Sequence, residues 1–153
     1  MAVEIERKFL VADERWRRFV AETQHVVQAY LAVTEHAEIR VRIVDGREAM
    51  LTVKSVRPGL VRTEYEIALA PEQARSMIAL RMGSCIEKRR HRVKPDDGRI
   101  WEIDEFLGEH AGLVIAEVEL RSPDEVVERF AWLGREVTGE RHYYNAALAG
   151  LSA

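Results

Sequence analysis

Charged and apolar residues alternate in short segments along almost the whole chain, and this period of two restricts the fold more than any other feature. In the first segment, Glu4, Glu6 and Lys8 alternate with Ile5 and Phe9. Successive side chains of an extended strand point to opposite faces, so the two acids and the lysine share one face. The pattern therefore predicts strands with one charged face and one apolar face.

The same alternation recurs in the later segments of the chain. Both bases and acids occur on the charged face, namely Arg40, Arg42, Lys54, Arg62, Glu64, Glu66, Lys88, Arg90, Arg92, Asp104, Glu117 and Glu119. An antiparallel sheet with one face in water shows such alternation without any function. Ser, Thr, Asn and Gln are scarce at these positions, however, so this face is more uniformly charged than an ordinary solvated face.

Taken in order, these segments resemble the motifs of the CYTH superfamily, the triphosphate tunnel metalloenzymes. Glu4-x-Glu6-x-Lys8 is similar to the ExExK signature of that family. The later matching motifs are Arg40-x-Arg42, Leu51-Thr52-x-Lys54, Arg62-x-Glu64-x-Glu66, Lys88-x-Arg90, Asp104 and Glu117-x-Glu119. The stretch from Thr138 to Leu148 resembles the C-terminus of the short bacterial inorganic triphosphatases. The resemblance covers nearly the whole chain, and so many ordered motifs with matching strand parity are specific.

Length and composition fit a soluble globular protein. We expect a single domain over residues 1–153, which is long enough to bury a core. The formal net charge of -3 gives no overall basic field, so no nucleic-acid partner is expected. No apolar segment approaches the roughly 20 residues that cross a bilayer, and the acidic Glu4 argues against a signal peptide. We therefore expect a cytoplasmic protein without membrane contact. Cys85 is the only cysteine, so no internal disulfide forms.

Helices are expected to begin near Asp13, Pro71, Ser122 and Arg141. Asp13 and the Ser122–Glu125 capping box can accept hydrogen bonds from a first turn, and Pro suits that turn. Apolar residues at helical spacing follow in the first three segments, namely Trp16, Phe19 and Val20, then Ala74, Met77 and Ile78, then Val126, Val127 and Phe130. Gly83 and Gly134 are expected to end the second and third helices.

The remaining segments predict about eight mostly antiparallel strands. After the first, they cover residues 25–33, 37–44, 47–56, 60–69, 84–94, 99–107 and 113–121, with turns at Asp45-Gly46, Arg57-Pro58-Gly59 and Pro95–Gly98. Many strands of even length favour closure into a barrel, because closure removes exposed edges. An apolar interior would give a lipocalin-like pocket. The amphipathic helices favour a charged interior instead, because their apolar stripes need an apolar sheet surface to cover.

The resemblance implies this second arrangement. The expected fold is α+β, a closed mostly antiparallel eight-stranded barrel that surrounds a charged tunnel, with helices packed outside. A lumen with so many charges is costly unless the charges are paired or neutralised by a ligand. A polyanion with bound cations satisfies both signs, and a triphosphate with two Mg2+ or Mn2+ ions fits.

The resemblance also implies the roles of the charged residues in metal-dependent hydrolysis of the terminal phosphate. The expected triphosphate contacts are Lys8, Arg40, Arg42, Lys54, Arg62, Lys88, Arg90 and Arg141. The expected metal ligands are Glu4, Glu6, Glu64, Glu66, Asp104, Glu117 and Glu119, although structural ion pairs are the simpler interpretation for Glu64 and Glu66. The expected catalytic residues are Glu4, Glu6, Lys8, Glu117 and Glu119. As an ordinary protonated lysine, Lys8 suits an electrostatic role better than that of a general base.

Other catalytic templates find no support in the chain. Both Gly-rich phosphate-binding loops are absent, and the five histidines form no H-x-x-x-H pair. Within the family, hydrolysis of thiamine triphosphate or nucleotides and cyclisation of ATP are the alternatives to hydrolysis of inorganic triphosphate, which the short-chain resemblance favours. A module that binds polyphosphate or nucleotide without turnover is the alternative outside enzymes. The expected partner is a small-molecule triphosphate, and the oligomeric state, including a homodimer, stays open.

Overall fold

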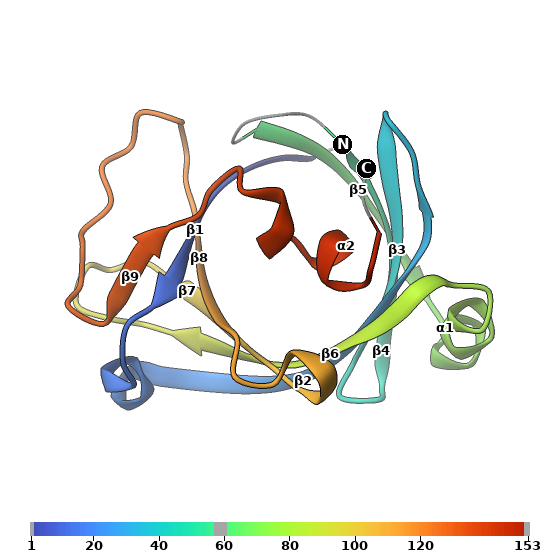
Figure 1. Ribbon diagram of the computed structural model, residues 1–153, viewed down its shortest axis with the longest axis horizontal. Coiled ribbons are helices and arrows are strands. Elements are labelled where there is room, and N and C mark those ends of the chain that lie inside the picture. The colour runs from blue at the N-terminus through green and yellow to red at the C-terminus, as the bar shows by residue number, and fades with distance from the viewer. Residues whose placement is uncertain (1, 57–60, 152–153) are drawn as a thin grey trace.

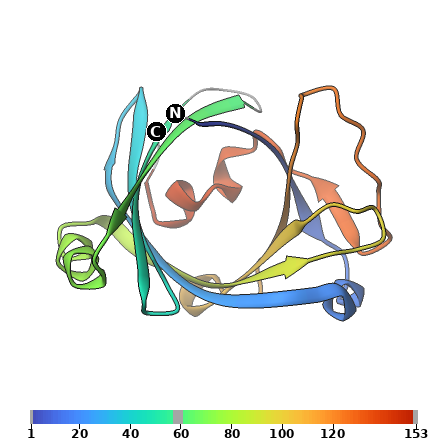
Figure 2. The same cartoon turned by 180° about the vertical axis from the view of Figure 1, so that it is seen from behind.

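Eight antiparallel strands close into a barrel in the computed structural model, which describes residues 2–56 and 61–151 (Figures 1 and 2). Around the ring, each strand pairs with the next in the order β1, β5, β4, β3, β2, β6, β7, β8 and again β1. Their bounds are β1 Ala2–Val11, β2 Val20–Val33, β3 Ala37–Val44, β4 Glu48–Ser55, β5 Val61–Leu69, β6 Met82–Val93, β7 Trp101–Phe106 and β8 Val114–Glu119. The predicted closed eight-stranded barrel is confirmed.

Strand β1 closes the barrel and also carries a ninth strand. Along one edge it pairs with β8 from Glu6 to Leu10. Along the other edge it pairs first with β5 and then with β9 (Leu133–Glu136). Between these two partners, the Lys8 N–H donates to Thr138 Oγ1 at 2.9 Å, and the Lys8 carbonyl accepts from the Val137 N–H at 2.8 Å. The backbone on both sides of the lysine is therefore held in place.

The apolar face of the barrel points outward and is covered, as expected for a charged interior. Helix α1 (Pro71–Ile78) packs on β3 and β4 through a cluster that includes Val41, Ile43 and Ala74. On the opposite side, the 3-10 helix η1 (Arg15–Phe19), β9 and the segment 121–132 cover a larger core around Trp16, Trp101 and Trp132. The two clusters leave the interior face of the strands to the charged residues.

The C-terminal segment lies within the barrel rather than outside it. It comprises the 3-10 helix η3 (Arg141–Tyr143) and helix α2 (Asn145–Leu148), which both views show inside the ring of strands (Figures 1 and 2). Ala146 and Ala149 pack in one cluster with Tyr30, Ile86, Phe106 and Ile115. Ile86 precedes Lys88 by two residues and Ile115 precedes Glu117 by two, so these apolar side chains share the inward face with the charged ones. One end of the lumen is thus apolar and filled.

The helix expected from the Ser122–Glu125 capping box does not form, and that prediction is wrong. The segment is irregular up to β9, and Val126 is 85% exposed rather than buried. The Glu125 carboxylate accepts from the Arg121 N–H at 2.7 Å and pairs with Arg99, whose guanidinium also binds the Val126 carbonyl at 3.0 Å. These contacts take up the groups that a first helical turn would use. Gly134 lies in β9, where an added Cβ would meet the Leu10 carbonyl at 3.1 Å.

Three smaller differences concern the ends of elements. The first predicted helix is only η1, and Val20, expected on its apolar face, begins β2. Helix α1 ends at Ile78, and Gly83 lies in β6 with φ +64, where an added Cβ would stand 2.2 Å from the Ala149 carbonyl. The Asp45-Gly46 turn is confirmed by positive φ at both residues. The Arg57-Pro58-Gly59 turn and the expected strand start at Leu60 lie outside the described residues.

Among the described residues, no helix is both long and apolar enough to cross a membrane.

Candidate active site

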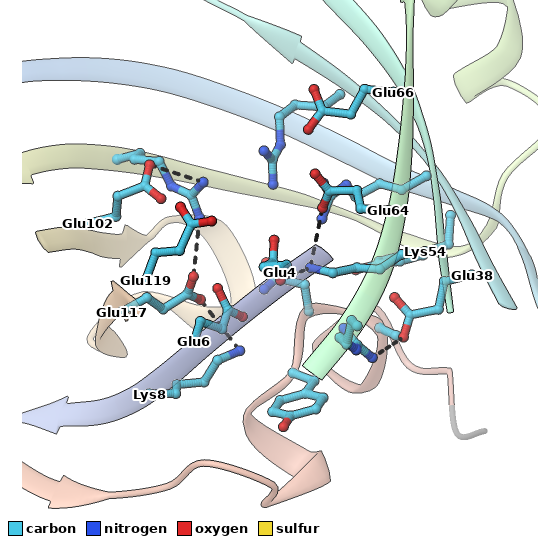
Figure 3. Close-up of a pocket in the computed structure, with 18 of the residues that line it drawn as sticks. Glu4, Glu6, Lys8, Glu38, Lys54, Glu64, Glu66, Glu102, Glu117 and Glu119 are labelled. Carbon is cyan, nitrogen blue, oxygen red and sulfur yellow. Dashed lines mark hydrogen bonds and ion pairs between the residues drawn. The ribbon is translucent and has the colours of Figure 1, made fainter. Parts of the chain in front are cut away.

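The inward faces of the strands enclose a polar cavity of about 390 Å³ beside the C-terminal segment. Most of the residues that line it are charged (Figure 3). The predicted site residues among them are Glu4, Glu6, Lys8, Arg40, Arg42, Lys54, Arg62, Glu64, Glu66, Arg90, Glu117 and Glu119. The fold therefore brings together side chains that span more than a hundred positions of the sequence.

The remaining predicted site residues do not line this cavity. Lys88 and Asp104 are 0% and 1% exposed and lie in the wall behind it. Arg141 lies in η3, just before the residues of the C-terminal segment that do line it. Five further polar residues line the cavity, namely Tyr30, Glu38, Glu102, Tyr144 and Asn145. Glu38 and Glu102 have the strand parity of Arg40 and Asp104, a signal that could have found them, whereas the other three carry no charge pattern.

Basic side chains crowd together on β3 and β6. Burial and the neighbouring Arg40 and Arg90 lower the pKa of Arg42 to about 9. Arg42 Nε donates to Gln28 Oε1 at 2.9 Å, but the buried Arg40 Nε has no hydrogen-bond partner among the described residues. Positive charge is thus concentrated here and only partly compensated, as expected of a site for an anion.

Asp104 holds two of the basic side chains from behind. Both of its oxygens accept from Arg90, at 2.8 Å each, and Lys88 Nζ lies 2.8 Å from Oδ2. Burial raises the pKa of Asp104, but Arg90 and Lys88 outweigh that effect and hold the pKa far below its ordinary value. Burial lowers the pKa of Lys88 to about 7 in spite of the carboxylate. These contacts are those of a positioning residue for the two bases.

Acidic side chains gather on the neighbouring strands β7, β8 and β1. Burial and the adjacent Glu117 raise the pKa of Glu6 to about 8, although Lys54 and Lys8 oppose the shift. Burial, Glu4 and Glu102 also raise the pKa of Glu119. Two carboxylates with raised pKa values mark a region where negative charge lacks compensation.

Two lysines compensate this acidic region in part. Lys54 Nζ lies 2.6 Å from Glu4 Oε1, an ion pair without the geometry of a hydrogen bond, and 3.7 Å from Glu64 Oε2. Lys8 Nζ lies 3.4 Å from Glu117 Oε1. Burial raises the pKa of Glu117, but Lys8 and Arg90 prevail and lower it to about 2.

The acidic region suits a hard divalent cation in its chemistry. The donors are all carboxylate oxygens, which Mg2+ and Mn2+ prefer, and the raised pKa of Glu6 reports charge that a cation would compensate. Within residues 2–56 and 61–151, no three acidic, His or Cys side chains already converge as a ligand set. The carboxylates of Glu4 and Glu117 face lysines, so binding a cation requires them to turn from these partners.

Comparison with known proteins places the chain in a family. The sequence model of the CYTH domain matches residues 2–146. The chain belongs to the CYTH domain family. The resemblance drawn from the motifs is therefore confirmed, and the cavity is the interior of a CYTH barrel.

Two relatives of the chain are named inorganic triphosphatase. The protein of Acetivibrio thermocellus is 38% identical over 149 residues, which cover 97% of this chain and 94% of the relative. The protein of Nitrosomonas europaea is 39% identical over 153 residues, covering 95% of this chain and 96% of the relative. A crystal structure of an inorganic triphosphatase superposes with a TM-score of 0.71 at 35% identity, covering all of this chain and 97% of that one.

Proposed function

We propose that this CYTH protein is a metal-dependent hydrolase that removes the terminal phosphate of inorganic tripolyphosphate. The observation that carries the proposal is the presence of both charges in one cavity, with arginines on β3, β5 and β6. The carboxylates come mainly from β1, β5, β7 and β8 (Figure 3). Guanidinium and ammonium groups form charge-assisted hydrogen bonds with phosphate oxygens. Carboxylates hold the cations that accompany a polyphosphate.

The composition of the cavity wall supports an inorganic substrate. The uncharged lining residues are Val3, Tyr30, Tyr144, Asn145 and Ala146, and all the others are charged. Ligand sites for molecules with a nucleobase or a thiamine ring are mostly apolar, whereas the described residues that line this cavity include only two aromatic side chains, Tyr30 and Tyr144. The volume of about 390 Å³ lies at the small end of the usual range for small-molecule sites. The names of the two curated relatives agree with this choice.

The basic residues serve as the clamp in this proposal. Arg40 and Arg42 face the cavity from β3, and Arg90 faces it from β6 with its guanidinium fixed by Asp104. Of the other predicted phosphate contacts, Lys8, Lys54 and Arg62 line the cavity and belong to the clamp, whereas Lys88 and Arg141 do not line it. Burying several like charges together is unfavourable in the free protein, and a triphosphate compensates them when it binds.

The acidic residues would hold the metal ions. Glu4, Glu6, Glu117 and Glu119 are the proposed ligands, with Glu64 and Glu66 on the facing strand β5, while Asp104 positions Lys88 and Arg90. When bound, a divalent cation offsets charge on the leaving group and makes a water molecule more acidic. Lys8 stands beside these carboxylates: burial lowers its pKa, but Glu117 and Glu6 raise it above the ordinary value. Lys8 is therefore a cation that stabilises the transferring phosphoryl group rather than a base.

The test is a phosphate-release assay on tripolyphosphate, pyrophosphate, thiamine triphosphate and ATP, each with Mg2+, with Mn2+ or with EDTA. We expect fastest turnover of tripolyphosphate with either metal and none with EDTA. Faster hydrolysis of ATP or thiamine triphosphate would refute the inorganic substrate. Full activity in EDTA would refute the metal dependence. Binding of tripolyphosphate without turnover of any compound would make the protein a binding module.

A further inference from the structure

Asn145 connects the C-terminal segment to the basic wall of the cavity. Its side-chain oxygen Oδ1 accepts from Gln28 Nε2 at 2.8 Å and from Lys88 Nζ at 3.0 Å. Gln28 and Lys88 are both 0% exposed. Gln28 Oε1 in turn accepts from Arg42 Nε at 2.9 Å. One chain of hydrogen bonds therefore joins Arg42 of the clamp to the buried Lys88 through two amides.

The Arg42 end of this chain fixes the orientation of both amides. A guanidinium group can only donate, so it must meet an oxygen. Gln28 turns its oxygen to Arg42 and consequently its nitrogen to Asn145. Asn145 must then present its oxygen to Gln28 and Lys88, and its nitrogen is left over. Both side-chain hydrogen bonds of Asn145 with the described residues use its oxygen, and none uses Nδ2. Asn145 also lines the cavity.

Resting on the proposed function, we propose that Asn145 is a further substrate-binding residue, whose Nδ2 donates a hydrogen bond to a phosphate oxygen at the inner end of the cavity. Ala146 and Ala149 fill the lumen beyond it with the apolar cluster, so the polar space ends here. Because Gln28 and Lys88 already hold the Asn145 oxygen, the Asn145 side chain loses little conformational entropy when the phosphate binds. Asn145 thus provides a neutral donor at a position where another cation would add to the crowding of Arg42 and Lys88.

The competing explanation is that Asn145 only anchors Lys88 and Gln28. Three substitutions separate the two roles. Asn145→Asp keeps an oxygen for Gln28 and Lys88, removes the donor and adds a negative charge that repels phosphate. Asn145→Leu, of similar size, removes both. Gln28→Met removes the hydrogen bonds of Gln28 to Asn145 and Arg42 but keeps the Asn145 amide in the cavity, because Gln28 itself does not line the cavity.

The KM and kcat for tripolyphosphate with Mg2+, and the Kd by calorimetry, are measured for the wild type and the three variants. A lost hydrogen bond to a charged phosphate should raise KM and Kd at least about tenfold in both Asn145 variants, with kcat changed by less than about threefold. Gln28→Met should raise KM by at most about threefold, since it removes a hydrogen bond that orients Arg42 but no contact with the substrate. Melting temperatures without ligand identify any variant that does not fold, and Asn145→Asp, which keeps the anchor, should fold as the wild type does.

The outcomes distinguish this inference from the proposed function. An active wild type with a near-normal KM in Asn145→Asp or in Asn145→Leu overturns the role of Asn145 alone. Equal KM increases in Gln28→Met and Asn145→Leu also overturn it, because they point to anchoring. A wild type that hydrolyses no triphosphate overturns the enzyme activity, and the calorimetric Kd values then still decide whether Asn145 contacts the phosphate chain.

Discussion

The ammonium nitrogen of Lys8 lies 4.3 Å from the centroid of the Tyr144 ring. Lys8 belongs to the first strand and Tyr144 to the C-terminal segment inside the barrel, so the two ends of the chain meet at the candidate active site. On its other side, the same ammonium group pairs with Glu117 at 3.4 Å. An aromatic face and a carboxylate together fix the direction of the lysine.

Removing the Tyr144 ring should misplace Lys8. Tyr144→Leu is expected to lower kcat/KM for tripolyphosphate about thirtyfold, because a desolvated cation–π contact is worth about 2 kcal/mol. Tyr144→Phe keeps the ring and loses only the hydrogen bond that the hydroxyl accepts from the Gly139 N–H at 2.9 Å. It should retain activity and lose a few degrees of melting temperature at most. Equal activity of the Leu and Phe variants would show that the ring does not position the lysine.

Arg40 should be needed for the ligand but not for the fold. Its buried Nε has no partner among the described residues, and Arg42 and the other bases crowd it. Arg40→Met, which keeps the apolar stem, should weaken tripolyphosphate binding about tenfold to a hundredfold and leave the ligand-free melting temperature unchanged or higher. Arg89→Met, an exposed arginine on the outer face of β6, is the matched control and should change neither. A loss of stability with normal affinity in Arg40→Met would make Arg40 a structural residue.

The barrel could be predicted because its signal is local. Strand parity alone put Arg40 and Arg42 on one face and Val41 and Ile43 on the other, and the structure has Val41 and Ile43 in the outer core. The inward direction of the charged face needed the resemblance, since an isolated strand looks the same from either side. Strand parity also does not tell how deeply a side chain is buried. Asp104 shares the face of the other acids but lies behind the cavity wall.

The C-terminal half was harder to predict because long-range contacts decide it. Ser122–Glu125 has the residues of a capping box, but Arg99, more than twenty positions earlier, binds Glu125 and the Val126 carbonyl. The roles of Tyr144 and Asn145 likewise depend on partners at the other end of the chain, Lys8 and Gln28. Neither residue is charged, so the alternation that revealed the other site residues could not reveal these two.

The ion pair of Arg7 with Glu136 should make stability depend on pH. Glu136 accepts from Arg7 at 2.6 and 2.9 Å and from Thr138 Oγ1 at 2.7 Å, and the Arg7 hydrogen bond is the main cause that lowers its pKa below 4.5. A carboxyl with a lowered folded pKa stabilises the protein above its unfolded pKa and loses this effect as pH falls through the folded pKa.

Glu136→Gln should therefore lower the free energy of unfolding by about 1 kcal/mol at pH 7, a value reduced by the partial exposure of the pair. The difference from the wild type should shrink as pH falls below 4.5. Urea unfolding at a series of pH values measures it. Glu14→Gln, in an exposed pair with Arg17, is the control and should have little effect. A difference that stays constant down to acid pH would exclude the ion pair as its cause.

Glu6 offers the sharpest separation of catalysis from binding and folding. Its carboxyl is buried next to Glu117 and Glu4, so its negative charge opposes the fold while no cation compensates it. Glu6→Gln keeps the size of the side chain and removes this charge. Without metal or ligand, the variant should melt at a higher temperature than the wild type. Tripolyphosphate binding should survive, because the bases of the clamp hold the phosphates.

Turnover of Glu6→Gln should nevertheless collapse. A lost transition-state interaction of about 3 to 4 kcal/mol corresponds to a rate lower by about a hundredfold to a thousandfold. Phosphate release with Mg2+ gives the rate, calorimetry the affinity, and a thermal melt in EDTA the stability. Glu72→Gln, on the exposed side of α1, is the control for loss of one negative charge and should match the wild type in all three measurements. Wild-type turnover in Glu6→Gln would remove Glu6 from the active site, and a lower melting temperature in EDTA would show that its charge is compensated within the fold.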